Sequence, residues 1–172
     1  MSSMERIIKE NNLDLSLEDN IWEIPTRIEL VNTIDTALER KLTRLGWKLS
    51  EIRDFVKYVF HELLINAIAH GNLGIDGGTP HIYEAALEEQ AKQKTDKKVF
   101  IKIDADPNKI TITIQDQGGG FTIENVDDPT KKENLRKTMG RGELFMKTFA
   151  TSIKHKNLEP EGHEVKITKE RE

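Results

Sequence analysis

The sequence predicts an α+β domain: a two-layer sandwich in which helices cover one face of a mixed, largely antiparallel sheet. Isoleucine and valine alternate with polar residues over 99–103 and again over 110–114, with Asp106-Pro107-Asn108 between them. This pattern is typical of a β-hairpin with one buried face. Apolar residues recur at helical spacing over 28–45 and 52–67. The chain has 172 residues, which indicates a single domain.

The first elements follow in chain order. Residues 1–19 are polar and mixed, so we expect them to form an N-terminal extension to a domain over 20–172. Residues 20–24 alternate between apolar and polar and predict a short strand. Thr26 and Glu29 form a capping-box pattern, which predicts the start of the first helix.

The later elements are predicted from the same patterns. They are a second helix from Ser50 to Gly71, a helix over 81–94 inside an insertion at about 73–98, a loop at about 122–139, a helix over 142–149 and a last strand over 165–167. Loops of about 20 residues inside a compact domain are usually functional or disordered. Trp22, Trp47 and the phenylalanines are expected in the core.

Composition excludes several classes of protein. Thirty acidic and 26 basic residues give a net charge of −4, which argues against a general binder of nucleic acid or anionic membranes. The absence of cysteine excludes a disulfide scaffold and a thiolate metal site. No apolar run reaches the roughly 20 residues of a membrane span, and residues 1–12 lack a signal-peptide pattern. We therefore expect a cytoplasmic protein.

A polar stripe on the second helix is the first candidate site. Glu62, Asn66 and His70 are spaced by four residues and are expected to share one helix face. A carboxylate and an amide one turn apart can hold a hard cation and orient a hydroxyl beside it. The alternative is a solvated helix face. The spacing of His61-Glu62 and His70 differs from the zinc-binding H-E-x-x-H pattern.

Two glycine-rich segments form the other candidate sites. Asp116-Gln117-Gly118-Gly119-Gly120-Phe121 follows the hairpin directly, where a ligand could approach the backbone and Asp116 could accept a hydrogen bond from an amine. Gly140-Arg141-Gly142 stands at the expected start of a helix, which favours anion binding. Five basic residues crowd this region, namely Lys131, Lys132, Arg136, Lys137 and Arg141. The alternatives are a flexible turn and a solvated basic loop.

The three segments in this order resemble the GHKL (Bergerat-fold) ATP-binding superfamily, and most closely its bacterial anti-sigma factor and serine kinase branch. The resemblance covers about residues 20 to 169. It rests on E-x-x-x-N-A-x-x-H-G at Glu62 to Gly71, on D-x-G-x-G-F at Asp116 to Phe121, and on a lid pattern at Asp128-Pro129-Thr130, Glu133-Asn134-Leu135 and Gly140-Arg141-Gly142.

The resemblance implies an ATP site with Mg²⁺. It implies that Asn66 binds the ion and that Glu62 acts as base or orients the acceptor hydroxyl. Asp116 is implied to read the adenine amino group, which favours ATP over GTP. The other implied nucleotide contacts are Gly118, Gly120, Phe121, Gly140, Arg141 and Gly142, the last three covering the phosphates.

Two departures from the family pattern concern this site. Glu143 stands where the family usually has leucine after G-R-G, so an acid lies near the phosphate site or points to solvent. Gly162-His163-Glu164-Val165 stands where the family often has threonines, which puts a water-bridged threonine contact to adenine in doubt.

The resemblance leads to a ranked set of functions. The first is an ATP-dependent serine/threonine kinase that phosphorylates a small antagonist protein and sequesters a sigma factor. The second is a nucleotide-dependent anti-sigma binding switch without phosphotransfer. A histidine kinase catalytic domain ranks lower, because about 20 N-terminal residues cannot supply a dimerising helical pair. The expected partner of this protein is the antagonist protein or the sigma factor, and a homodimer is possible. We expect it to bind neither nucleic acid nor membranes directly.

Overall fold

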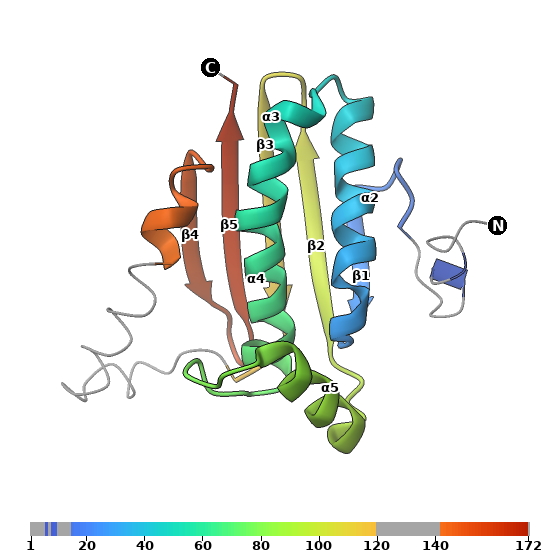
Figure 1. Ribbon diagram of the computed structural model, residues 1–172, viewed down its shortest axis with the longest axis vertical. Helices are drawn as coiled ribbons and strands as arrows, with labels where there is room; N and C mark the ends of the chain where they lie inside the picture. The colour runs from blue at the N-terminus through green and yellow to red at the C-terminus, as the bar shows by residue number, and fades with distance from the viewer. Residues whose placement is uncertain (1–5, 7, 10–14, 120–141, 172) are drawn as a thin grey trace.

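The computed structural model describes residues 6, 8–9, 15–119 and 142–171 (Figure 1). Its sheet has five strands in the order β1-β2-β3-β5-β4, and each neighbouring pair is antiparallel. The strands are β1 (Ile21–Pro25), β2 (Lys98–Ala105), β3 (Lys109–Asp116), β4 (Ser152–Asn157) and β5 (His163–Glu170). The sheet predicted to be mixed is thus antiparallel at every pairing between these strands.

The helices form a second layer over one face of this sheet (Figure 1). They are η1 (Ile28–Leu30), α2 (Val31–Arg44), α3 (Leu49–Phe55), η2 (Val56–Phe60), α4 (His61–Asn66) and η3 (Ala67–Asn72). The helix α5 (Ile82–Gln93) lies at one end of this layer, against η1 and η3 (Figure 1). The segments α3, η2, α4 and η3 follow one another without a break, and η2 and η3 are π-helical turns. The α+β two-layer prediction is confirmed.

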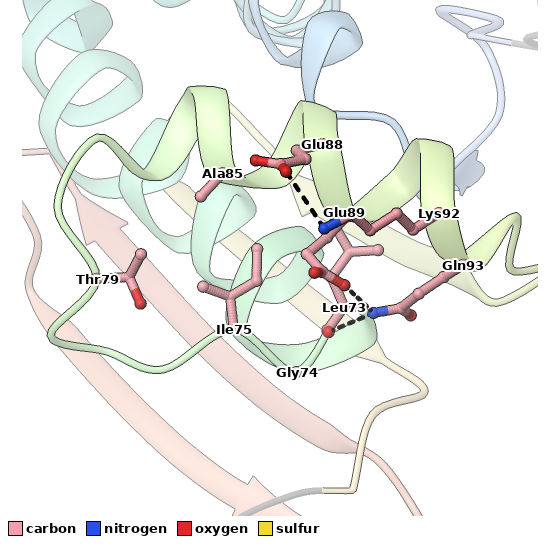
Figure 2. A pocket seen from close by; sticks show the side chains of 9 residues that line it. All are labelled: Leu73, Gly74, Ile75, Thr79, Ala85, Glu88, Glu89, Lys92 and Gln93. Atoms are coloured by element: carbon pink, nitrogen blue, oxygen red, sulfur yellow. Dashed lines mark hydrogen bonds and ion pairs between the residues drawn. The ribbon is translucent and has the colours of Figure 1, made fainter.

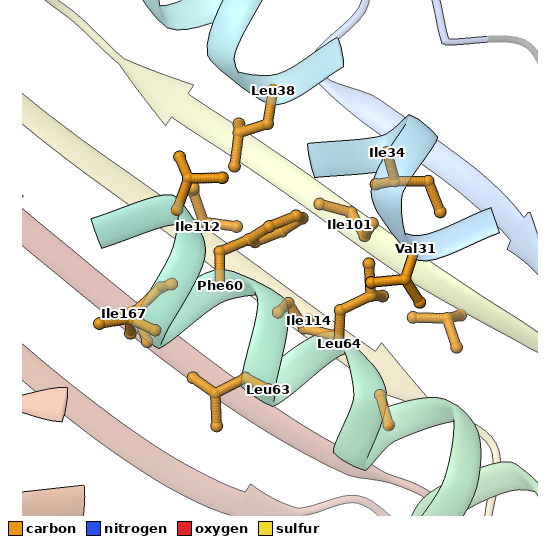
Figure 3. Packing of buried hydrophobic residues seen from close by; sticks show 14 of the residues in the cluster. Val31, Ile34, Leu38, Phe60, Leu63, Leu64, Ile101, Ile112, Ile114 and Ile167 are labelled. Carbon is orange, nitrogen blue, oxygen red and sulfur yellow. The ribbon is translucent and has the colours of Figure 1, made fainter. Parts of the chain in front are cut away.

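The hydrophobic core lies between the two layers. Figure 3 shows Phe60 and Leu64 from the long helix pointing at Ile112 and Ile114 of β3, and all four side chains are buried. Their spacing explains the arrangement, because alternate residues of β3 face the helices while η2 and α4 turn their apolar side toward the sheet. The apolar periodicity in the sequence therefore identified the buried faces correctly.

The aromatic residues divide between core and surface. Trp22 and Trp47 are buried, as predicted, and each indole N–H donates to a backbone carbonyl, Ser16 and Asp106 respectively. Phe145 departs from the prediction, because its side chain is 53% exposed. It meets Tyr58 edge to face at the surface, with ring centroids 5.4 Å apart.

The first helix begins differently from the prediction. The Thr26 hydroxyl, expected to cap the helix, donates instead to the Lys97 carbonyl at 2.6 Å. The Ile28 N–H donates to Gln90 Oε1 of α5 at 3.0 Å, and Gln90 Nε2 donates to Glu29 at 2.6 Å. A tertiary contact from α5 thus replaces the local capping box. Because Gln90 lies about 60 residues away in sequence, local spacing could not reveal it.

The second helix starts one residue earlier than predicted. It begins at Leu49, and the Lys48 N–H donates to Glu51 Oε1 at 3.0 Å, so Ser50 does not cap it. The helix predicted over 81–94 is confirmed as α5. No helix among residues 6, 8–9, 15–119 and 142–171 has the length and apolar character to cross a membrane.

Strand β4 was not predicted. Its sequence, Ser-Ile-Lys-His-Lys-Asn, has one apolar residue, and most of its side chains are exposed. It forms an edge of the sheet, where lysines protect the open hydrogen-bonding groups from pairing with another chain. An edge strand with this role lacks the alternation that identified the other strands. β5 extends the predicted 165–167 strand at both ends.

Candidate functional site

Asp116 is the last residue of β3, and its side chain lies at the end of the apolar row of that strand. The residue is 4% exposed. Its Oδ1 accepts a hydrogen bond from the Gly118 N–H at 2.9 Å, and the His163 N–H also donates to the carboxylate. The alternation that buries the strand's isoleucines therefore directs a carboxylate into the protein, where it needs these donors.

Two glycines hold the helix end and the glycine-rich loop together around this carboxylate. A Cβ at Gly71, in η3, would lie 2.4 Å from Asp116 Oδ2. A Cβ at Gly118 would lie 2.0 Å from the Gly71 carbonyl oxygen. Both contacts are too short for any side chain, so only glycine permits this approach. The structure thus joins two of the three predicted motifs in one place, whereas Gly119 faces open space.

Burial raises the pKa of Asp116 to about 6. Hydrogen bonds from the Gly118 and His163 N–H groups, with the charge of Lys97, lower it by smaller amounts. The carboxylate is therefore ionised at pH 7 to 8, in surroundings that contain little water. Such a group is a strong hydrogen-bond acceptor for a ligand that brings an N–H donor.

Glu62 and Asn66 occupy one exposed side of α4, as predicted. The π-helical turns η2 and η3 flank this segment, and such turns in helices are frequent at functional sites. His70 does not extend the stripe as a free side chain, because its Nδ1 is hydrogen bonded to the Ile75 carbonyl at 2.6 Å. The stripe therefore has two available polar members, a carboxylate and an amide.

Asn72 is a buried polar residue that the sequence did not single out. Its Nδ2 donates to Thr26 Oγ1 at 2.9 Å and to the Lys98 carbonyl at 3.0 Å, and its Oδ1 accepts the Gln117 N–H at 2.7 Å. It ties the end of the helix to the residue that follows β1, to β2 and to the loop after Asp116. We see no local signal for it, since its partners come from three distant segments.

His61 and Asp35 form a second pair beside Glu62. His61 Nδ1 lies 2.5 Å from Asp35 Oδ2, and Asp35 Oδ1 is buried without a hydrogen-bond partner among the described residues. The hydrogen bond with Asp35 raises the pKa of His61, whereas burial raises the pKa of Asp35. Both residues line an open cavity that also contains Glu62 and Lys57. Local sequence spacing could not reveal this pair, because Asp35 belongs to a different helix, α2.

A separate cavity lies between α5 and the turn that follows η3 (Figure 2). Gln93 closes one side, and its Nε2 donates to the Leu73 carbonyl at 2.9 Å. The ion pair of Lys92 with Glu88 spans its rim at 3.2 Å. None of the predicted site residues lines this cavity, so it is distinct from the Asp116 site.

The two departures from the family pattern have defined positions. Glu143 does not point to solvent alone, because its Oε1 contacts His155 Nε2 of β4. His163 lies directly opposite Asp116 in the β3–β5 register. Gly142 is exposed and starts a helical turn over 142–146.

Several predicted residues lie outside the described part of the chain. They are Gly120, Phe121, Gly140 and Arg141, the basic residues Lys131, Lys132, Arg136 and Lys137, and the loop predicted at about 122–139. Within the described residues, no three acidic or histidine side chains gather in a way that could hold a metal ion.

The fold and the site together define the class of the protein. An antiparallel sheet covered on one face by helices, with a buried acid held by glycines at the end of a Glu/Asn helix, is the arrangement of the Bergerat-fold ATPases. The chain belongs to the histidine kinase-like ATPase domain family, which it matches over residues 24–169. This confirms the GHKL superfamily predicted from the motifs. No protein of curated function matches the chain.

Proposed function

We propose that the protein is an ATP-binding serine/threonine kinase of the anti-sigma type, which phosphorylates a small antagonist protein. Membership in the histidine kinase-like ATPase family supports ATP-dependent activity. The observation that carries the proposal is the buried Asp116 carboxylate. It is held between Gly118 in the loop after β3 and Gly71 at the end of the helix that presents Glu62 and Asn66.

The described residues fit an adenine nucleotide. Asp116 is an ionised acceptor in a dry setting, which suits the exocyclic amine of adenine and disfavours the carbonyl of guanine. The close approach of Gly118 to Gly71 keeps side chains away from the carboxylate, and Gly119 opens to free space. Gly120 and Phe121, which follow in the sequence, would contact the nucleotide, and Gly140, Arg141 and Gly142 would contact the phosphates.

Glu62 and Asn66 fit the chemistry beside the phosphates. The amide oxygen of Asn66 suits a hard cation such as Mg²⁺, which takes most of its other ligands from phosphates and water. Glu62, one helical turn earlier, would accept the proton of a serine or threonine hydroxyl on its carboxylate. Both side chains are exposed, so a protein substrate can reach them. ATP supplies the phosphoryl group when bound.

The second candidate is a nucleotide-dependent binding switch without phosphotransfer. The segment predicted as an insertion supports it, because α5 packs its buried Ala86 inward while Tyr83 and Leu87 stay exposed. Gln90 bonds α5 to the start of the first helix. A firmly held helix with exposed apolar residues provides a surface for a partner protein.

The experiment that separates these functions measures phosphate transfer and nucleotide binding on the same variants. Labelled ATP, Mg²⁺ and purified small antagonist-type proteins are incubated with the wild type, Glu62→Gln and Glu88→Gln. We expect Glu62→Gln to slow transfer by about 100-fold or more, because general-base catalysis contributes that much, with ATP affinity changed by about threefold at most.

Glu88→Gln is the matched control, since it removes a carboxylate from an exposed ion pair on α5. It should transfer phosphate at the wild-type rate. Transfer at the wild-type rate by Glu62→Gln would refute the role of that residue. Binding of ATP with no labelled acceptor would instead favour the binding switch.

A further inference from the structure

Side chains from three neighbouring strands form a row that starts at Asp116. Asp116 Oδ2 lies 3.9 Å from His163 Nδ1, across the β3–β5 pairing. His163 Nε2 lies 3.1 Å from His155 Nδ1 on β4, and the two rings stack with centroids 5.1 Å apart. The row ends at Glu143, whose Oε1 contacts His155 Nε2. Four polar groups thus connect the candidate adenine site to the turn at 142–146.

The proton positions along this row depend on one another. An ionised Glu143 can only accept, so His155 donates its Nε2–H and its Nδ1 becomes an acceptor. His163 then donates from Nε2, which leaves the lone pair of its Nδ1 facing Asp116. A His155 that donates from both nitrogens would reverse this order: His163 would accept at Nε2, and its Nδ1–H would point at Asp116.

We propose that His163 is a positioning residue for Asp116, and that His155 and Glu143 determine which proton arrangement His163 presents to it. This inference rests on the proposed ATP site, in which the ionised carboxylate accepts from adenine. An Nδ1–H of His163 directed at Asp116 favours its ionised form, which can bind adenine. A proton taken up by Asp116 itself removes that acceptor.

The charges around the row support this division of roles. Burial, with a smaller effect of His155, lowers the pKa of His163 to about 4. His163 is therefore neutral near pH 7, and its tautomer changes rather than its charge. Among the described residues, Lys97 is a charged side chain that lowers the pKa of the Asp116 carboxyl. The part of η3 that lies against the Asp116 carboxylate is the backbone of Gly71, which carries no charge.

The test is the pH dependence of ATP affinity, measured by calorimetry with Mg²⁺ between pH 5 and 8. The full chain is compared with Glu143→Gln, His155→Phe and the double variant. In the wild type, affinity should fall on acidification as Asp116 takes up its proton. In Glu143→Gln, the arrangement in which His155 donates from both nitrogens loses its anionic acceptor. The Nδ1–H of His163 then no longer supports the ionised form of Asp116, and the midpoint of this fall moves up by about half a pH unit or more.

The direction of this shift distinguishes the row from simple electrostatics. If Glu143 acted on Asp116 only through space, removing its negative charge would lower the pKa of Asp116. The midpoint would then move to a lower pH. In the His155→Phe background, Glu143→Gln should have no further effect, because the connection is already broken. Glu164→Gln is the matched control, because it also removes one negative charge from a residue next to His163. Glu164 lies opposite Lys156 and is not part of the row, so the midpoint of this variant should equal that of the wild type.

Two outcomes overturn separate claims. A midpoint in Glu143→Gln that stays at the wild-type pH or moves down overturns the role of the row, while ATP binding itself stands. Absence of ATP binding by the wild type at every pH overturns the proposed function, and this inference with it. The ¹⁵N shifts of the His163 ring give an independent reading, since a tautomer change with pH should be lost in Glu143→Gln.

Discussion

At the scale of residues, the buried Asp116 carboxylate of the proposed ATP site lowers the stability of the fold when it is ionised. Burial holds its carboxyl pKa at about 6, so the ionised form is less favourable in the folded chain than in the unfolded chain. The protonated form carries no such penalty. The penalty is therefore absent below about pH 4, grows between pH 4 and 6, and is constant above pH 6.

We predict that Asp116→Asn stabilises the fold at pH 8 while it weakens ATP binding. A pKa raised from 3.8 to about 6 corresponds to a gain of roughly 3 kcal/mol at most. Urea unfolding from pH 4 to 8 measures the difference from the wild type. That difference should rise between pH 4 and 6, and a difference independent of pH would contradict the account.

The residues that could be predicted are those whose role is visible in local sequence. Asp116, Glu62 and Asn66 stood out because a polar residue broke an apolar period or followed a strand directly. Asn72 did not, and His163 was noted only as a departure from the family pattern, because their partners come from other strands and helices. A register between β3 and β5 places His163 opposite Asp116 across 47 positions of sequence, 163 less 116. No local pattern carries that information.

At the scale of elements, the site depends on contact between the end of η3 and the loop after β3. Gly71 and Gly118 allow their backbones to meet, and Asn72 bonds the same helix end to Gln117 of the loop. The apolar periods predicted the helices and the hairpin, which bury large apolar faces. They did not predict β4, whose polar edge sequence has no buried row, or the π-helical turns around α4.

We predict that Gly71→Ala disrupts this contact. The added methyl group would lie 2.4 Å from Asp116 Oδ2, so either the helix end or the carboxylate must move. Unfolding in urea should show a loss of about 1–3 kcal/mol, although alanine is the better helix former, and ATP affinity should fall at least about tenfold.

Gly77→Ala provides the control, because nothing lies within 4 Å of a Cβ there. Its stability should match the wild type within about 0.5 kcal/mol. Equal stability and equal ATP affinity for Gly71→Ala and Gly77→Ala would show that the helix end does not set the position of Asp116.

At the scale of the whole molecule, the net charge of −4 gave a misleading first impression about phosphate. The total argues against long polyanions, yet five of the 26 basic residues fall between Lys131 and Arg141. The family match over 24–169 agrees with a single nucleotide-binding domain across the sheet and its helices. The strands with a buried row, the main helices and the site's two central motifs were predictable, whereas the edge strand β4 and the cross-strand row were not.

The most direct test of this account is a calorimetric titration of the wild-type protein with ATP and with GTP, each with Mg²⁺ at pH 8. Asp116 is ionised at that pH and in the proposed site would accept from the amino group of adenine, while guanine presents a carbonyl that would leave the buried acceptor unpaired. We predict that ATP binds at least about tenfold more tightly than GTP. Equal affinities for the two nucleotides, or no binding of ATP, would contradict the central claim.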